Sequence, residues 1–216
     1  MKLILASNNA KKLAELRALL SGLPLDIVSQ SALGLDEADE PHHSFVENAL
    51  AKARHAALAS GCAAIADDSG LCVGALGGAP GVVSAHYGGE LPAQPGEDRE
   101  ARRRRQDAVN NAALLAALEA RAAEGVADRR AHFISTLVAI RHADDPEPLV
   151  AVGRWPGEVL AQARGSQGFG YDPLMYIPAL GATVAELDAD TKNRHSHRAR
   201  AAAALRAMLA EAWHLA

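Results

Sequence analysis

Two adjacent carboxylates, Asp67 and Asp68, follow a short apolar stretch and precede Ser69 and Gly70. Carboxylates at the end of a strand lie where α/β sheets place ligand sites, and side-chain alternation directs only one of the pair into a cleft. Mg²⁺ prefers oxygen ligands and commonly takes one or two carboxylates together with substrate phosphates. Because Asp, Ser and Gly also favour tight turns, the segment predicts either a cation site or an ordinary turn.

Further candidate metal ligands are few. Asp39 and Glu40 end an acidic loop at residues 36–40, and either could supply another oxygen from across the cleft. The two cysteines, Cys62 and Cys72, are too few for a disulfide scaffold, and their spacing fits no zinc motif. The cysteine content therefore favours a reducing cytosol, and the chemistry that the sequence predicts is that of oxygen ligands.

A small polar segment follows the first apolar run of the chain and precedes a predicted helix. It consists of Ser7, Asn8, Asn9, Ala10, Lys11 and Lys12. The N-terminus of a helix presents unpaired N–H groups and a partial positive charge, and two lysines there favour a polyphosphate site. The pattern of a P-loop is absent, and a capped helix with its lysines in solvent is the alternative.

A glycine-rich segment at residues 165–172 ends in Phe169, Gly170, Tyr171 and Asp172. An aromatic ring beside a hydrogen-bond acceptor can stack on a nucleobase and hold its edge, whereas a core role for the ring is the alternative. Three more polar side chains lie near the start of the last predicted helix: Lys192, His197 and Arg198. There the alternative is a solvated helix cap.

The elements that position these residues alternate between strands and helices in the first half of the chain. Apolar runs predict strands at residues 2–6, 26–29 and 63–66, the last of which delivers the two aspartates. Helical spacing predicts helices at 10–20, from a capping box at Ser44 to about residue 60, at 107–124 and at 196–213. A β-hairpin is expected at 131–141 and 148–155, with a third strand at 157–163. The fold class is therefore α/β with one elongated mixed sheet.

Composition excludes several classes of protein. Hydrophobic residues make up 49% of the 216 residues and charged residues 22%, which is typical of a globular protein of one domain. No stretch approaches the length of a membrane helix, and the short N-terminal apolar run does not fit a signal peptide. The net charge of −4 argues against a general grip on nucleic acid, so the arginine run at residues 102–105 is interpreted as a solvated helix face.

The order of the motifs along the chain resembles the inosine triphosphate pyrophosphatase family, the XTP/dITP diphosphatases. The motifs that carry the resemblance are S-N-N-x-K-K, F-x-E-N-A-x-x-K-A, A-D-D-S-G-L, L-G-G-A-P-G-V-x-S-A, G-F-G-Y-D-P and a late S-H-R. They extend from the first strand to the last helix and so cover essentially the whole chain.

This resemblance implies a fold and an activity. The fold would be a single domain, residues 1–216, with an elongated mixed sheet flanked by helices and two lobes around a central cleft, assembled as a homodimer. The enzyme would be a cytoplasmic, Mg²⁺-dependent hydrolase that cleaves ITP, dITP and XTP to the monophosphate and pyrophosphate. Its role would be to remove deaminated purines from the nucleotide pool.

The resemblance also implies roles for the residues at matching positions. Ser7, Asn8, Asn9, Ala10, Lys11, Lys12 and Lys52 would hold the triphosphate, and Ser69 would touch substrate. Asp68 would be the general base and a metal ligand, with a second metal carboxylate at Asp39 or Glu40. Phe169, Gly170, Tyr171, Asp172, Lys192, His197 and Arg198 would surround the base. Asn8 and His86 depart from the family pattern, in which Gly and Arg are usual.

The physical logic agrees with these roles. Lys12, Lys52 and Mg²⁺ would neutralise the triphosphate while Asp68 deprotonates a water that attacks the α-phosphorus. Lys192 and Arg198 only donate hydrogen bonds, so they favour a 6-keto purine over adenine, although guanine must be rejected in another way. The rival hypotheses are a nucleotide sensor without turnover, against which the retained carboxylate pair argues, and an RNA-binding protein.

Overall fold

The computed structural model describes residues 1–215, which divide into two compact units. Unit 1 contains Met1–Ser69, Ile134–Arg154 and the chain from Asn193 onward, and unit 2 contains Gly70–Phe133 and Trp155–Lys192. Because the chain crosses between them several times, each unit is assembled from segments that are distant in sequence. Within residues 1–215 no helix combines the length and the apolar character needed to cross a bilayer.

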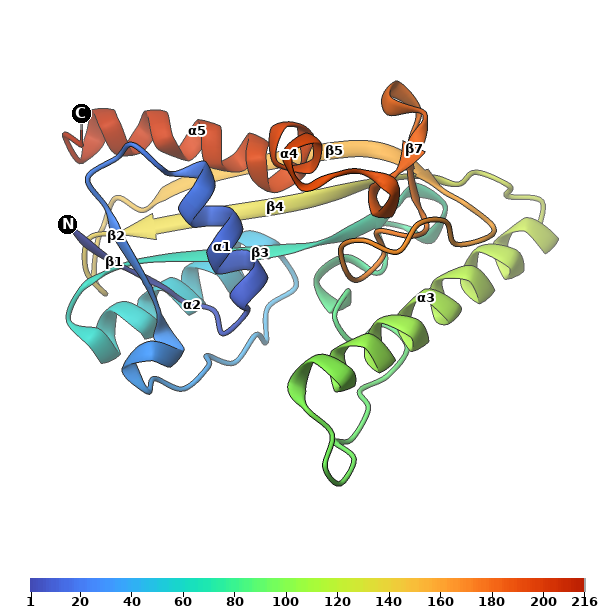
Figure 1. Ribbon diagram of the computed structural model, residues 1–216, viewed down its shortest axis with the longest axis horizontal. Helices are drawn as coiled ribbons and strands as arrows, with labels where there is room; N and C mark the ends of the chain where they lie inside the picture. The colour runs from blue at the N-terminus through green and yellow to red at the C-terminus, as the bar shows by residue number, and fades with distance from the viewer. Residues whose placement is uncertain (216) are drawn as a thin grey trace. The chain divides into compact units, whose positions relative to one another are not determined.

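The strands within residues 1–215 form a seven-stranded sheet in the order β2-β1-β3-β4-β5-β6-β7 (Figure 1). Strand β1 runs parallel to β2 and β3, whereas β6 runs antiparallel to β5 and β7. The strands are β1 (Lys2–Leu5), β2 (Asp26–Ser29), β3 (Ala63–Val73), β4 (Arg130–Ile140), β5 (Leu149–Val159), β6 (Met175–Ile177) and β7 (Ala182–Thr183). The predicted α/β class with a mixed sheet is confirmed.

The α-helices of the described chain carry recognisable end signals. They are α1 (Ala10–Leu19), α2 (Phe45–Ser60), α3 (Arg99–Ala123), α4 (Ala189–His195) and α5 (His197–Ala212). At the start of α2 the Ser44 hydroxyl accepts a hydrogen bond from the Glu47 N–H, and Gly61 ends the helix with φ of +65°. The capping serine and the terminal glycine are those that the sequence predicts.

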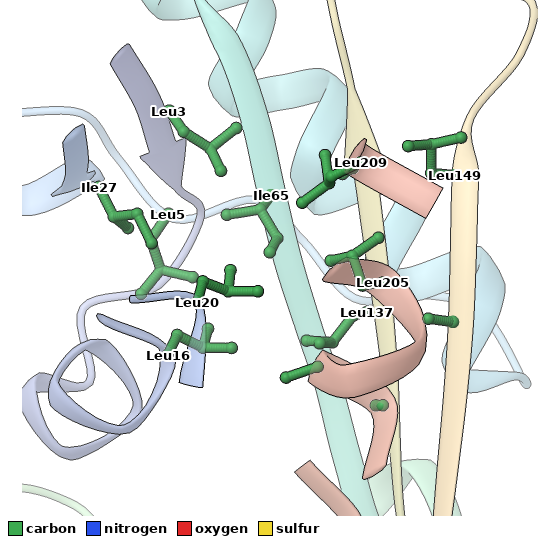
Figure 2. Packing of buried hydrophobic residues seen from close by; sticks show 14 residues of the cluster. Leu3, Leu5, Leu16, Leu20, Ile27, Ile65, Leu137, Leu149, Leu205 and Leu209 are labelled. Carbon is green, nitrogen blue, oxygen red and sulfur yellow. The ribbon is translucent and has the colours of Figure 1, made fainter. Parts of the chain in front are cut away.

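Side-chain alternation along the strands of unit 1 creates two hydrophobic layers. Odd-numbered residues such as Leu3, Ile65 and Leu137 pack with α1 and α5 in one buried cluster (Figure 2). Even-numbered residues such as Ile4 and Ala64 pack with α2 in another cluster. The α2 side of the second cluster consists of alanines (Ala49, Ala53, Ala56 and Ala57) at helical spacing. The same alternation decides which helices meet the carboxylates further along β3.

A different cluster forms the core of unit 2. Leu114 and Leu118 of α3 pack with Leu71 and Val73 at the end of β3 and with Trp155 of β5. This packing fixes α3 against the strands of its own unit.

Several boundaries differ from the predictions. β3 is continuous through the two aspartates, so neither the predicted strand end nor a turn occurs there. α3 begins eight residues earlier than predicted, because Asp98 caps its N-terminus. Residues 157–159 of the predicted third strand are instead the end of β5, residues 160–163 are not in a strand, and α4 is an additional helix.

Candidate active site

Asp67 and Asp68 are consecutive residues in the middle of β3, and both are almost completely buried. Since consecutive side chains of a strand point to opposite faces, Asp67 lies on the face of Ile65 and Asp68 on the face of Ala66. The first face is covered by α1 and α5, the second by α2. Each aspartate therefore meets cations from different helices.

Asp67 is surrounded by hydrogen-bond donors. Its Oδ2 atom lies 3.1 Å from Lys12 Nζ of α1, and 3.0 Å and 2.9 Å from Arg198 Nε and Nη2 of α5. Its Oδ1 atom accepts a hydrogen bond of 2.8 Å from the Ser135 hydroxyl of β4. Arg198 also pairs with Glu15 of α1. Asp67 thus joins three elements of unit 1 through one carboxylate.

The charges around Asp67 decide its protonation. Burial alone would raise the pKa of this carboxyl, but Arg198, Lys12 and the Ser135 hydroxyl hold the pKa well below its usual range. Burial also lowers the pKa of Lys12, an effect that Asp67 opposes. Asp67 therefore stays ionised at any physiological pH and anchors the two cations.

Asp68 is paired on the other face of β3. Lys52 Nζ of α2 lies 2.7 Å from Asp68 Oδ1 and 3.0 Å from Glu40 Oε2, so one lysine bridges two carboxylates. Burial raises the pKa of Asp68 to about 6, since it outweighs the opposing attraction of Lys52. Asp68 Oδ2 is buried and accepts no hydrogen bond within residues 1–215. The carboxylate keeps one unsatisfied acceptor.

The predicted phosphate segment forms the turn between β1 and α1. Asn9 caps α1, because its side chain accepts hydrogen bonds from the N–H groups of Lys11 and Lys12, and Ser7 Oγ accepts from the Asn9 N–H. Asn8 Oδ1 is buried without a hydrogen-bond partner within residues 1–215. Ala10 is the first residue of the helix. The segment therefore has the helix N-terminus that the sequence predicts, with Lys12 directed to the carboxylate of Asp67.

A second group of candidate residues gathers in unit 2. The Asp172 carboxylate accepts a 2.9 Å hydrogen bond from the Phe169 N–H, and its Oδ2 atom lies 2.8 Å from Lys192 Nζ. Lys192 Nζ also lies 4.6 Å from the centre of the Phe169 ring. Gly168 has φ of +78°, and a Cβ atom there would lie 2.0 Å from Asp172 Oδ2. The glycine thus permits the close approach that orients the carboxylate.

The remaining predicted residues have other surroundings. Tyr171 is buried in the core of unit 2, where its hydroxyl donates to the Ser84 carbonyl over 2.8 Å. His197 is buried at the first position of α5, and Asp39 is exposed in the acidic loop. Ser69 Oγ donates to Asp67 and accepts from Arg198, so Ser69 extends the network on the Asp67 face. Arg198 itself contacts Asp67, Glu15 and Ser69.

Sequence reasoning missed Glu15 and Ser135, which complete the Asp67 network. Glu15 lies one turn after Lys12 on α1, and this spacing places both residues on one helix face. Ser135 lies two residues before Leu137 on β4, so the two side chains point to the same face of the sheet. Leu137 is buried in the same cluster as Ile65. Helical and strand periodicity could therefore have indicated both residues once the first carboxylate was taken as buried.

Two carboxylates, Asp68 and Glu40, are the candidate ligands for a divalent cation. Within residues 1–215 no three His, Cys, Asp or Glu side chains gather in a way that would hold a metal by themselves. The unsatisfied oxygen of Asp68 and the nearby carboxylate of Glu40 nevertheless fit a hard cation that takes its other ligands from substrate phosphates and water.

Comparison with known proteins identifies the family. The model of the Ham1 family matches residues 3–208. The chain belongs to the Ham1 family. Proteins named dITP/XTP pyrophosphatase from Leptothrix cholodnii and Methylibium petroleiphilum are 66% and 63% identical to it. The alignments cover 100% and 99% of both partners, respectively.

Solved structures of Ham1 proteins have the same fold. A HAM1 protein from Coxiella burnetii is 40% identical and superposes with a TM-score of 0.86 over 98% of this chain and 99% of that one. The Staphylococcus aureus Ham1 protein is 33% identical, with a TM-score of 0.79 over 97% and 98% of the two chains. The resemblance inferred from the motifs is therefore confirmed at the level of family and fold.

Proposed function

We propose that this protein hydrolyses dITP, ITP and XTP to the nucleoside monophosphate and pyrophosphate. The observation that carries the proposal is the charged cluster of unit 1, in which Lys12 and Lys52 meet the adjacent carboxylates Asp67 and Asp68 beside the N-terminus of α1. The names of its relatives, dITP/XTP pyrophosphatase, support the same activity.

The lysines and the helix terminus would bind the triphosphate. Lys12 and Lys52 supply two positive charges, and the first turn of α1 offers backbone N–H groups to phosphate oxygens. Phosphoryl transfer requires positioning and charge neutralisation more than covalent help from the protein. Asp67 acts as a positioning residue, since it holds Lys12 toward the cluster.

Asp68 would be the general base. Its pKa of about 6 leaves the carboxyl ionised at pH 7 to 8 and still basic enough to accept a proton from water. The unsatisfied Oδ2 atom is an acceptor for that proton. Asp68 and Glu40 are the residues that would hold Mg²⁺, which when bound would neutralise phosphate charge and raise the acidity of water. Lys52 orients both carboxylates.

The loop around Phe169 would bind the base. Its ring offers a stacking surface, and Lys192, fixed by Asp172 over 2.8 Å, donates hydrogen bonds to a keto group. The resemblance also implies that His197 and Arg198 contact the base. The resemblance also leads us to expect a homodimer, which sedimentation velocity tests. A location in the cytoplasm is expected because the proposed substrates belong to the nucleotide pool.

The experiment that tests the function is pyrophosphate release from ITP, XTP, GTP and ATP with Mg²⁺. We expect rapid release from ITP and XTP, and loss of about 10²–10⁴-fold in kcat for Asp68→Asn. Asp128→Asn is a matched control, because Asp128 pairs with Arg130 on the surface of unit 2. If ITP and XTP bind but release no pyrophosphate, the protein is a nucleotide sensor and the proposal is wrong.

A further inference from the structure

Helix α3 presents a row of three polar side chains to the loop that contains Phe169. Arg103, Asp107 and Asn111 are four residues apart, so they lie on one face of the helix. Asp107 Oδ2 accepts a 2.8 Å hydrogen bond from the Gly170 N–H, and Asn111 Nδ2 donates 3.0 Å to the Gly170 carbonyl. Asp107 and Asn111 therefore bind the backbone N–H and the backbone carbonyl of Gly170, respectively.

The third member of the row reaches the aromatic ring. The Arg103 guanidinium carbon lies 4.7 Å from the centre of the Phe169 ring, which is stacking distance for a cation and an aromatic ring. Lys192 lies 4.6 Å from the same centre. Phe169 thus has two cations near its ring within unit 2, Arg103 from α3 and Lys192 from α4. A base that stacks on Phe169 shares the ring with these two side chains.

The chemistry of the two side chains is uniform, since Arg and Lys donate hydrogen bonds and accept none. One oxygen of each nearby carboxylate is already used, because Asp172 Oδ2 accepts from Lys192 and from the Phe169 N–H, and Asp107 Oδ2 accepts from the Gly170 N–H. Hypoxanthine offers one oxo group to such a site, at C6. Xanthine offers two, at C6 and C2, whereas guanine places an amino group at C2 that meets a donor.

We propose that Arg103 determines specificity at position 2 of the purine, so that it favours the 2-oxo group of xanthine and disfavours the 2-amino group of guanine. This inference rests on the proposed function and adds to it the basis on which guanine nucleotides are rejected. Lys192 is held by Asp172 and meets the 6-oxo group that all three bases share, so it does not discriminate among them. Arg103 is the second donor, and only position 2 differs among the three bases.

The test compares kcat/KM for XTP, ITP and GTP in the wild type, Arg103→Met and Arg103→Lys. Methionine keeps the apolar stem and removes the donors, and lysine keeps a donor and the charge. We expect Arg103→Met to lower the XTP-to-GTP ratio by roughly 10- to 100-fold, as for the loss of a hydrogen bond to a charged group. The ITP values change least, since hypoxanthine has only hydrogen at C2, and Arg103→Lys restores part of the ratio.

Arg104→Met is the matched control, because the Arg104 side chain is 68% exposed and its ion pair with Glu100 spans 3.8 Å. Its three substrate ratios should equal those of the wild type. If Arg103→Met changes stability or all three substrates equally, Arg103 only packs against Phe169 and the inference is wrong.

Calorimetric binding of the xanthosine, inosine and guanosine monophosphates separates this inference from the proposed function. Absence of pyrophosphate release from every triphosphate would overturn the function. A preference for the xanthosine over the guanosine monophosphate that Arg103→Met abolishes would still support the role of Arg103. Equal binding of both by the wild type would refute it.

Discussion

Replacing Asp67 by Asn should destabilise the protein strongly. The Asp67 side chain has no exposed surface and pairs with Lys12 and Arg198, whose side chains are 17% and 2% exposed. One orientation of the amide points its NH₂ group at the two cations and the other points it at Ser135, so neither restores the negative charge that Lys12 and Arg198 face. Removing one partner of a buried ion pair costs about 3–5 kcal/mol, because the remaining charge stays buried. For a chain of this size that corresponds to a decrease in Tm of roughly 6–20 °C.

The assay is thermal and urea denaturation of the wild type, Asp67→Asn and Asp128→Asn. Asp128 also pairs with an arginine, Arg130, but the Arg130 side chain is 81% exposed. We therefore expect the Tm of Asp128→Asn to equal that of the wild type within error. The pKa of Asp67 in the folded state lies below its usual value of 3.8, so ionised Asp67 stabilises the fold at every pH above 3.8. This stabilisation is lost only as the pH falls below 3.8 and through the pKa of the folded state. The difference between wild type and Asp67→Asn should therefore be constant from pH 8 to pH 5. A Tm decrease no larger than that of Asp128→Asn would refute the reasoning.

Two further predictions concern the other carboxylates. Because the pKa of Asp68 is raised from 3.8 to about 6, the folded state binds more protons between these values and stability falls as pH rises through them. The free energy of unfolding of Asp68→Asn, relative to that of the wild type, should accordingly increase by up to about 3 kcal/mol from pH 4 to pH 7 without divalent cations. Urea denaturation at each pH measures this difference, and a difference that does not change with pH would contradict the prediction. Gly168→Ala should displace Asp172 and lower kcat/KM for ITP on the order of 10²-fold. Gly181 also has a positive φ, +65°, but a Cβ added there meets no atom within 4 Å, so Gly181→Ala should retain activity. Equal activity of the two alanine variants would show that the Asp172 position does not depend on Gly168.

Local signals made part of the fold predictable. Both ends of α2 are visible in the sequence, since Ser44 caps its start and Gly61 ends it, and the structure places the helix between these residues. The start of α3 was not predictable from apolar spacing, because the buried residues of its first turns are polar, Gln106 and Asn110. An N-cap at Asp98 is the local signal that could have corrected the boundary.

The continuity of β3 depends on contacts that no local pattern contains. Asp, Ser and Gly favour turns, yet Asp67 remains in the strand because Arg198, 131 residues later, donates to its carboxylate. Tertiary context of this kind regularly overrides intrinsic strand preference. The motifs could indicate that these lysines and carboxylates lie near one another. Only the fold shows that Lys12 pairs with Asp67 and that Lys52 pairs with Asp68.

The contrast between Asp67 and Asp68 follows from strand geometry. Alternation turns neighbouring carboxylates toward opposite faces of β3, and the helices on those faces bring unequal numbers of cations. Asp67 receives Lys12 and Arg198 and has a lowered pKa, whereas Asp68 receives Lys52, shares it with Glu40 and has a raised pKa. Adjacent acids whose pKa values are driven apart commonly divide acid–base work from electrostatic support. On this argument Asp67 cannot replace Asp68 in the proposed role of base, because a carboxylate that holds two cations has little affinity for a proton.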